Sequence, residues 1–286
     1  RYGKHFAKFD RAVLDLSPTR CVCRCTRDYA KRFPRWIGWR AMGGWKRCGW
    51  SRIARRFALS VRRSTLRSVR LRATANARCG LRGSETERSV AHGLENQIRL
   101  FGGRGCSFPP IVACGPRAAL PHARPESVTI ESHGLLLIDW GADERGGYKS
   151  DLTRVLVTGK ISPKLERVYR LVLKAQQRAI DSIRPGVLCS AVDAVARKVL
   201  SSGGFGKFFG HGLGHGIGLD IHEGPRLAGG CDRPLKAGMV VTVEPGIYLP
   251  GIGGVRIEDD VLVTRDGREV LSDMPKGWDD SHVTLG

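Results

Sequence analysis

The stretch of sequence that says most about the fold is GHGLGHGIGLDIHE, residues 210–223, which sets three histidines and two carboxylates on a glycine-rich backbone. Five glycines between positions 210 and 218 make an ordinary helix improbable. An extended segment would place His211 and His215 on one face because their spacing is even, and its glycines would let neighbouring backbone approach closely. Imidazoles and carboxylates bind divalent metals, whereas the alternative is a flexible, solvated loop.

The charge of the chain is distributed very unevenly around this stretch. The 286 residues carry a net charge of +21 and are 41% hydrophobic, which is enough apolar material for a buried core. Residues 1–80 hold 22 Lys and Arg but three acidic residues, whereas residues 81–286 hold 26 and 24. The sequence therefore predicts two parts, a basic segment over residues 1–80 and a globular domain after it.

Three interpretations of residues 1–80 remain open. The segment is a basic arm that binds nucleic acid, an organellar targeting peptide, or upstream or out-of-frame coding sequence. We favour the third, because the segment lacks glutamate and its composition changes abruptly near residue 85. An amphipathic helix is expected within it over residues 53–69, with apolar residues at helical spacing.

The cysteines and the hydropathy place the chain in a reducing, aqueous compartment. Nine cysteines form no paired zinc-binding spacing, so structural thiols are expected. No apolar stretch reaches the length that spans a membrane, and no signal peptide pattern opens the sequence. We therefore expect a cytoplasmic protein without a membrane partner.

Helical and strand-like patterns alternate along residues 84–286, and the strand-like runs are expected to form hairpins. This order predicts an α+β fold in which helices cover an antiparallel sheet. Capping residues and glycine or proline stops bound the helices, and apolar runs mark the strands. The expected helices are 84–101, 162–183 and one that a capping box at Ser190 and Asp193 opens and Gly203-Gly204 ends. The expected strands are an irregular or edge strand at 106–114, then 135–139, 151–158, 239–244, 246–249 and 255–263.

Five polar residues stand at the end or in the middle of apolar strand-like runs, where a charge is costly unless something pairs with it. Taken singly, each has an ordinary structural explanation. Together, four carboxylates and one imidazole form an oxygen-rich set that suits two divalent ions with bridging carboxylates. The five are Asp139, Asp151, His215, Glu244 and Glu258.

The motifs that contain these residues resemble a known family. In order they read DxGA, SDxTR, HGxGHGxGLxxHE, VEPGxY and GVRIEDD. They are similar to the pita-bread metallopeptidases of family M24, in the branch of the Xaa-Pro dipeptidases and Xaa-Pro aminopeptidases. The resemblance implies the pita-bread (creatinase/aminopeptidase) fold over residues 84–275, with 276–286 as a tail. Residues 1–80 are too short and too basic to be the creatinase-like domain that usually precedes it.

The resemblance implies a role for each of the five residues. Asp139 would chelate one metal ion, Asp151 and Glu258 would bridge both, and His215 and Glu244 would complete the second. Manganese is the expected metal, with cobalt or zinc as alternatives. A hydroxide shared by the two ions would be the nucleophile.

The same resemblance implies a catalytic pair and a substrate pocket. Glu244 would transfer the proton, and His222 would contact the substrate carbonyl or the oxyanion. His122 and His211 would bind substrate, and Arg256 would hold the set of carboxylates or bind the terminus of the substrate. For Arg256 the alternative is a salt bridge to Asp151 or Asp259, and Asp259 and Asp260 are expected behind the ligands or at the surface.

The expected activity is hydrolysis of the Xaa-Pro bond at the amino terminus of dipeptides or short peptides. Its substrate would be a proline-containing peptide, and the protein could form a homodimer. One alternative is a non-catalytic pita-bread relative that binds nucleic acid or protein, although a nucleic-acid partner is disfavoured because all five ligand types are present. The other is an enzyme similar to methionine aminopeptidase.

Overall fold

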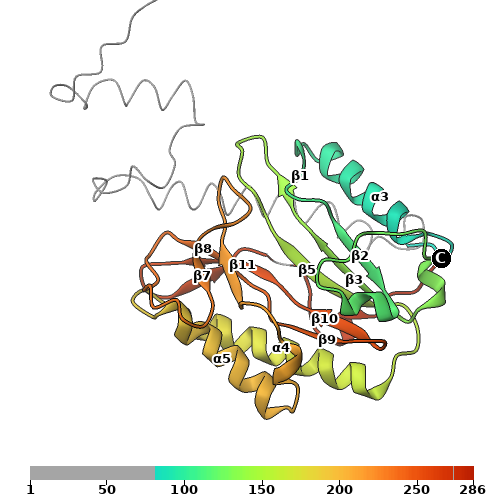
Figure 1. The fold of residues 1–286 in the computed structure, drawn as a ribbon. Coiled ribbons are helices and arrows are strands. Elements are labelled where there is room, and N and C mark those ends of the chain that lie inside the picture. Colours follow the sequence, from blue (N-terminus) through green and yellow to red (C-terminus); the bar gives the residue numbers. More distant parts are fainter. Residues whose placement is uncertain (1–80, 273) are drawn as a thin grey trace, which may run out of the picture. The chain divides into compact units, whose positions relative to one another are not determined.

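The computed structural model describes residues 81–272 and 274–286 (Figure 1). The segment 1–80, with the helix expected at 53–69, lies outside the described residues, and the division into segment, domain and tail stays a prediction. The helices are α3 (Glu87–Leu100), α4 (Pro163–Ser182) and α5 (Cys189–Ser202). The strands are β1 (Gly105–Cys106), β2 (Ile111–Cys114), β3 (Leu135–Trp140), β4 (Ala142–Asp143), β5 (Leu152–Val157), β6 (Gly214–Gly216), β7 (Glu223–Leu227), β8 (Val240–Val243), β9 (Gly246–Leu249), β10 (Gly253–Arg256), β11 (Asp259–Val263) and β12 (Arg268–Val270).

The expected α+β class is confirmed, because every ladder between these strands is antiparallel and helices cover the sheets. One sheet has the order β2-β3-β5, and a second has the order β12-β11-β8-β6-β7. Two further pairs, β9 with β10 and β1 with β4, complete the described strands. Strand β2 lies at a sheet edge, as predicted for the irregular run before residue 114.

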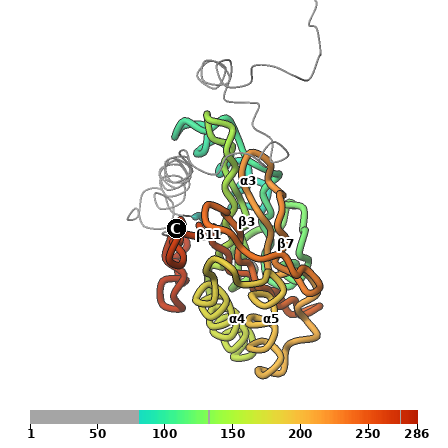
Figure 2. The backbone as a smooth tube through the Cα atoms, turned by 90° about the vertical axis from the view of Figure 1, so that its left-hand side faces the viewer, coloured from blue at the N-terminus to red at the C-terminus, as the bar shows by residue number. Residues whose placement is uncertain are grey.

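Strand β3 is apolar on both faces because both of its faces are covered. Leu136 and Ile138 pack in one core cluster with α3. Leu135 and Leu137 pack in the other, with α4 and α5. Figures 1 and 2 show α4 and α5 side by side on one side of the strands and α3 on the other. A run of consecutive apolar residues thus forms the middle strand of a layered structure.

The ends of the helices follow local chemistry in two cases and depart from the prediction in one. Thr86 caps α3 in a capping box with Ser89, and Ser162 caps α4. The expected capping box at Ser190 is wrong, because α5 begins at Cys189 and its N-cap makes no side-chain hydrogen bond. Ser190 instead donates to Asp232 over 2.7 Å, on the loop that packs beside the helix. A tertiary partner therefore replaced the local one.

Two expected extended segments are shorter than predicted. The run 255–263 is two strands that belong to different sheets, β10 and β11, with residues 257 and 258 between them. In the glycine-histidine run, β6 covers only residues 214–216, so His211 lies outside the strand that holds His215. Between β10 and β11 the chain changes sheets, and this change places Glu258 where the sheets meet.

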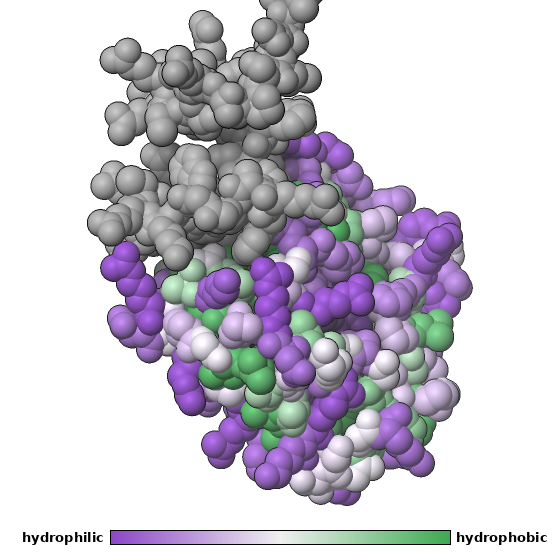
Figure 3. Space-filling model, turned by 60° about the vertical axis from the view of Figure 1, so that its left-hand side comes forward, coloured by the Kyte–Doolittle hydropathy of each residue, from purple (hydrophilic) through white to green (hydrophobic). Residues whose placement is uncertain are grey.

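The surface of the described part is mixed in character. On the face that Figure 3 shows, hydrophilic side chains alternate with smaller apolar groups. Among the described residues, no helix combines the length and the apolarity that crossing a bilayer requires.

Candidate metal centre

Three side chains that are far apart in the sequence meet where the sheets converge. Asp151 directly precedes β5, His215 is the middle residue of β6, and Glu258 lies between β10 and β11. Each offers one donor atom, and these atoms all lie within 4.8 Å of one another. That spacing is small enough for one cation to bind all three, so the cluster is a candidate metal centre.

The other two predicted ligands flank this cluster. The Nε2 atom of His215 lies 3.6 Å from Asp151 Oδ2 and 3.6 Å from Glu244 Oε1. Asp139 stands opposite Thr153 in the ladder between β3 and β5. Thr153 follows Asp151 by two residues, so Asp139 lies close to the cluster. Its Oδ2 accepts a hydrogen bond of 2.5 Å from Arg256, whereas its buried Oδ1 has no hydrogen-bond partner among the described residues.

The carboxylates of this cluster repel one another and are removed from water. Burial, followed by the charge of Glu258, raises the pKa of Asp151 well above its ordinary value. Burial and the charge of Glu244 do the same to the pKa of Glu258. Burial also raises the pKa of Glu244 to about 8, although Arg256 opposes the shift. Divalent cations would relieve this repulsion and give Asp139 Oδ1 a partner, so the donor set fits the metal pair that was predicted.

The histidine is prepared to act as a neutral ligand. Burial lowers the pKa of His215 to about 4, so the ring carries no charge at neutral pH. Its Nδ1 lies 3.0 Å from the carbonyl oxygen of Gly216. A proton on Nδ1 would donate to that carbonyl, and the lone pair of Nε2 would then face the carboxylates.

The glycines beside His215 are required by close backbone packing. A Cβ atom on Gly214 would lie 2.0 Å from the carbonyl oxygen of Thr242, and one on Gly216 would lie 2.4 Å from that of Gly224. Side chains at these positions would push β6 away from its neighbours β8 and β7. The close backbone approach that the sequence predicted for these glycines is confirmed.

Arg256 holds Asp139 and thereby organises the carboxylates. Its guanidinium donates to Asp139, to Thr153 Oγ1 over 3.1 Å and to the Tyr248 hydroxyl over 2.8 Å. Thr153 in turn donates to Glu258 Oε2 over 2.6 Å. The predicted alternative of a salt bridge from Arg256 to Asp151 or Asp259 is wrong, because the guanidinium pairs with Asp139 of β3, which belongs to a different sheet. Arg256 itself is buried.

The other three histidines that were predicted for the site, His122, His211 and His222, border the cluster on its more open side. The exposed ring of His222 packs edge-on against His215, with 4.4 Å between the ring centroids. His211 Nε2 lies 2.9 Å from the Tyr248 hydroxyl, and His122 is exposed beside Pro121, whose carbonyl oxygen accepts from Arg256 over 3.3 Å. All predicted site residues therefore lie at or beside one locus, and their individual roles stay predictions.

Several buried polar residues of the site were not assigned a role from the sequence. Thr153 and Arg154 belong to the SDxTR motif, but the motif alone does not say what they contact. Asp259 and Asp260, expected behind the ligands or at the surface, are both fully buried. Asp260 accepts a hydrogen bond of 3.2 Å from the backbone of Asp151. Three consecutive acidic residues directly before an apolar strand were the available signal.

Comparison with known proteins gives a consistent result. The model of metallopeptidase family M24 matches residues 55–265. An Xaa-Pro dipeptidase of Pyrococcus horikoshii is 42% identical over 186 residues, which are 65% of this chain and 53% of that protein. The crystal structure of an X-Pro aminopeptidase from Thermotoga maritima superposes with a TM-score of 0.72 at 38% identity, covering 81% of this chain and 64% of that one. The structure of a prolidase from Pyrococcus furiosus superposes with a TM-score of 0.72 at 37% identity, covering 78% of this chain and 65% of that one.

These relatives are longer than the chain described here. The chain spans about half the length of the curated relatives that it matches. The similarity covers the residues of the metal centre, because the matched range of the family model includes positions from Asp139 to Glu258.

Proposed function

This chain belongs to metallopeptidase family M24, and from that premise we propose that it hydrolyses the Xaa-Pro bond at the amino terminus of dipeptides or short peptides. The observation that carries the proposal is the convergence of Asp151, His215 and Glu258, whose donor atoms lie within 4.8 Å of one another. The likeness to Xaa-Pro dipeptidases and to solved prolidases, which share the pita-bread fold, supports the choice of substrate.

The proposed metal is a pair of divalent ions, with manganese as the first choice. Asp139 would hold one ion, Asp151 and Glu258 would bridge both, and His215 with Glu244 would complete the second. When bound, such ions act as Lewis acids and lower the pKa of a shared water, so that hydroxide is available as the nucleophile at neutral pH. The mixed oxygen and imidazole donors would also accept cobalt or zinc.

The residues of the chain would divide the remaining work. Glu244 is partly accessible, with 19% of its side chain exposed, and it would accept a proton and pass it to the leaving proline nitrogen. His222 is exposed beside His215, where it would donate a hydrogen bond to the oxygen on which negative charge develops. Arg256 and Thr153 would keep Asp139 and Glu258 in place during these steps.

The peptide would lie on the side where the histidines border the cluster. His122 and His211 would contact the substrate there. Arg256 would keep these two histidines in place through its bonds to Tyr248, which contacts His211, and to the carbonyl oxygen of Pro121, which precedes His122. Substrate length, assembly as a homodimer and a place in the cytoplasm are parts of the same proposal.

The proposal is tested by hydrolysis assays on the purified chain with added manganese. The chain should release the amino-terminal residue from an Xaa-Pro dipeptide or tripeptide, and a chelator should stop the reaction. Glu244→Ala should lower kcat by about a thousandfold or more, because it removes both a ligand and the proton carrier. Asp266→Ala removes an exposed carboxylate and should leave the rate unchanged.

Two results would contradict the proposal. The first is activity that survives both the chelator and Glu244→Ala. The second is a chain that binds no metal and no peptide but binds nucleic acid with steep salt dependence, which would favour the non-catalytic alternative.

A further inference from the structure

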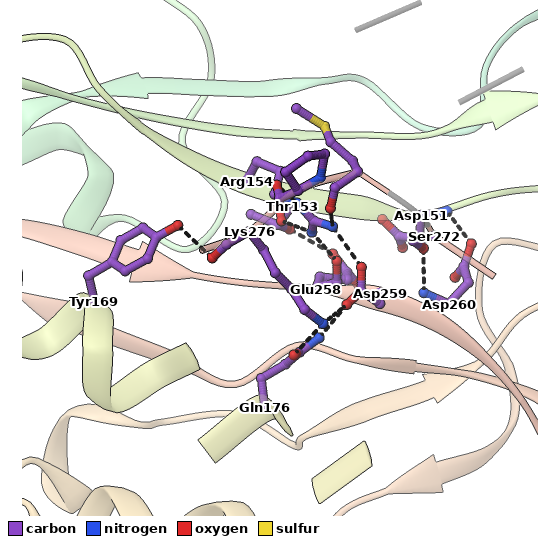
Figure 4. Close-up of polar contacts among 12 residues, drawn as sticks. Asp151, Thr153, Arg154, Tyr169, Gln176, Glu258, Asp259, Asp260, Ser272 and Lys276 are labelled. Carbon is purple, nitrogen blue, oxygen red and sulfur yellow. Dashed lines mark hydrogen bonds and ion pairs between the residues drawn. The ribbon is translucent and has the colours of Figure 1, made fainter. Parts of the chain in front are cut away.

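A polar cluster lies directly behind the metal centre, and the proposed chemistry does not use it. Its hub is the fully buried carboxylate of Asp259, the residue that follows Glu258. One oxygen accepts from Arg154 Nη2 over 2.7 Å, and the other accepts from Gln176 Nε2 over 2.7 Å and from Lys276 Nζ. Lys276 also donates to Gln176 Oε1 over 2.8 Å (Figure 4). The cluster thus joins β11, β5, α4 and the segment that follows β12.

Arg154 connects this cluster to the backbone of the proposed bridging ligand. Its Nη1 donates to the carbonyl oxygens of Glu258 over 2.6 Å and of Thr153 over 2.9 Å. Its other two nitrogens donate to the carbonyl oxygens of Met274 over 2.7 Å and Pro275 over 3.1 Å. The side chain is buried, so these bonds are formed away from water and fix the guanidinium in one place.

The segment that carries Lys276 is itself attached at several points. Trp278 packs edge-on against Tyr169 of α4 at 5.2 Å, and the Arg170 guanidinium lies 5.0 Å from the centre of the Trp278 ring. The Tyr169 hydroxyl donates to the carbonyl oxygen of Lys276 over 3.1 Å. Farther along, the backbone of Val283 donates to Val157 of β5 over 3.0 Å. The lysine is therefore presented from an anchored piece of backbone.

We propose that Lys276 and Gln176 are positioning residues for the metal centre, because they fix Asp259 and, through Arg154, the backbone of Glu258. The inference rests on the proposed function, which assigns Glu258 as the bridging ligand. In this arrangement the segment after β12 and helix α4 set the position of a carboxylate that neither of them touches. Partners of this kind, one shell behind the ligands, commonly change metal affinity when they are replaced.

The test compares the full-length chain with its Lys276→Met variant after both have been stripped with a chelator. Mn(II) is titrated into each protein, and the free ion is followed by its paramagnetic resonance signal. We expect Lys276→Met to weaken Mn(II) binding by about tenfold and to lower kcat with little change in KM. Lys276→Arg restores a cation that reaches Asp259, and it should recover most of the affinity.

Matched variants separate positioning from loss of charge or of stability. Lys174→Met removes the same charge from an exposed position of α4 and should leave binding unchanged. Gln176→Leu should weaken binding in the same direction as Lys276→Met, whereas Gln177→Leu, at the exposed neighbour, should not. Thermal melts of the metal-free variants show whether each is folded at the assay temperature.

The outcomes distinguish this inference from the proposed function. A parent chain that binds Mn(II) and cleaves Xaa-Pro peptides, together with folded Lys276→Met and Gln176→Leu variants of equal affinity, overturns the positioning role alone. A weaker Mn(II) affinity that Lys276→Arg restores supports it. A parent chain that neither binds Mn(II) nor cleaves these peptides overturns the proposed function and, with it, this inference.

Discussion

The two sides of the candidate metal centre are built in opposite ways. The carboxylate floor consists of five buried residues, Asp139, Asp151, Thr153, Arg256 and Glu258. Hydrogen bonds join Arg256 to Asp139 and to Thr153, and Thr153 to Glu258, and Asp151 lies beside them, directly before β5. The histidine arm is the run 210–223, in which the ordered strand is only three residues long and His222 is exposed. The polar side chains of the floor are buried, whereas the arm buries Leu213 and Ile217 and leaves His222 exposed.

This difference teaches how stability and chemistry are divided in the molecule. A change in the carboxylate floor leaves a buried charge or donor without its partner, which costs stability as well as metal affinity. A change at His222, an exposed residue of the histidine arm, alters a partly solvated group, which costs chemistry and little stability. The loss of unfolding free energy should therefore be large for changes that affect the floor and small for a change at His222.

Arg154→Met should give the largest loss of stability, about 3–5 kcal/mol of unfolding free energy. The variant removes one buried partner of Asp259 and leaves the carbonyl oxygens of Glu258 and Met274 without their donor. Chemical denaturation in the presence of a chelator measures it, with the exposed Arg178→Met as the control. A loss below about 1 kcal/mol would show that the carboxylate floor does not depend on the guanidinium of Arg154, which bonds to the carbonyl oxygen of Glu258.

Thr153→Val should cost about 1–3 kcal/mol, because it keeps the shape of the side chain and removes a hydroxyl that joins two charged groups. The hydroxyl donates to Glu258 and accepts from Arg256, and it is fully buried. The same denaturation assay, with Mn(II) binding measured in parallel, checks the prediction. Unchanged stability together with unchanged affinity would remove Thr153 from the floor.

The stability of the metal-free protein should change by about 1 kcal/mol, or a few degrees of melting temperature, between pH 7 and pH 9. Burial raises the pKa of Glu244 from 4.5 to about 8, so the folded state retains a proton that the unfolded state releases. The metal-free protein should therefore lose stability as the pH rises from 7 to 9. His215 contributes little in this range, because its folded-state pKa of about 4 leaves it neutral and the ordinary value of 6.5 leaves it mostly neutral in the unfolded chain.

Bound metal should reverse this dependence, because its ligands must be deprotonated. Calorimetry with Mn(II) and with a chelator should show a difference in melting temperature that widens from pH 7 to pH 9. Glu244→Gln has no proton to lose at this position and should make the metal-free curve less steep, with the remaining slope supplied by Asp151 and Glu258. A difference that narrows with pH would contradict the assignment of these carboxylates.

His222→Ala should leave the unfolding free energy within about 0.5 kcal/mol of the parent while kcat falls about a hundredfold. The ring is exposed and packs against His215, so its loss removes a donor and no buried partner. Denaturation and Xaa-Pro hydrolysis are measured on the same preparation. A large loss of stability would show that the arm is as integral to the core as the floor.

The local features of the fold were predictable, and the long-range pairings were not. The apolar run of β3 and the start of α4 at Ser162 follow from neighbouring residues, which is why they were predicted correctly. The pairing of Arg256 with Asp139 joins residues on different sheets, and no spacing in the sequence indicates it. The split of the run 255–263 into β10 and β11 is equally invisible, because local propensity does not select a sheet partner.

The candidate site shows the same limit. Its five proposed ligands could be named from motifs, and the structure brings Asp151, His215 and Glu258 within 4.8 Å of one another. Arg256 was predicted to hold the carboxylates or the substrate, and it bonds to Asp139. Thr153 and Arg154 were missed, because a threonine or an arginine inside a motif does not reveal its partner. Lys276 lies where the sequence predicted only a tail, yet it bonds to the buried Asp259. Motifs identify chemistry, whereas tertiary packing decides what supports it.

The most direct test of this account is the stoichiometry of Mn(II) bound to the chelator-stripped chain and to its Glu258→Gln variant, measured from the paramagnetic resonance of the free ion. We expect two ions per chain for the parent protein and a marked loss of binding for Glu258→Gln, with the variant still folded. A parent chain that binds no Mn(II), or a variant that binds both ions as tightly as the parent, would contradict it.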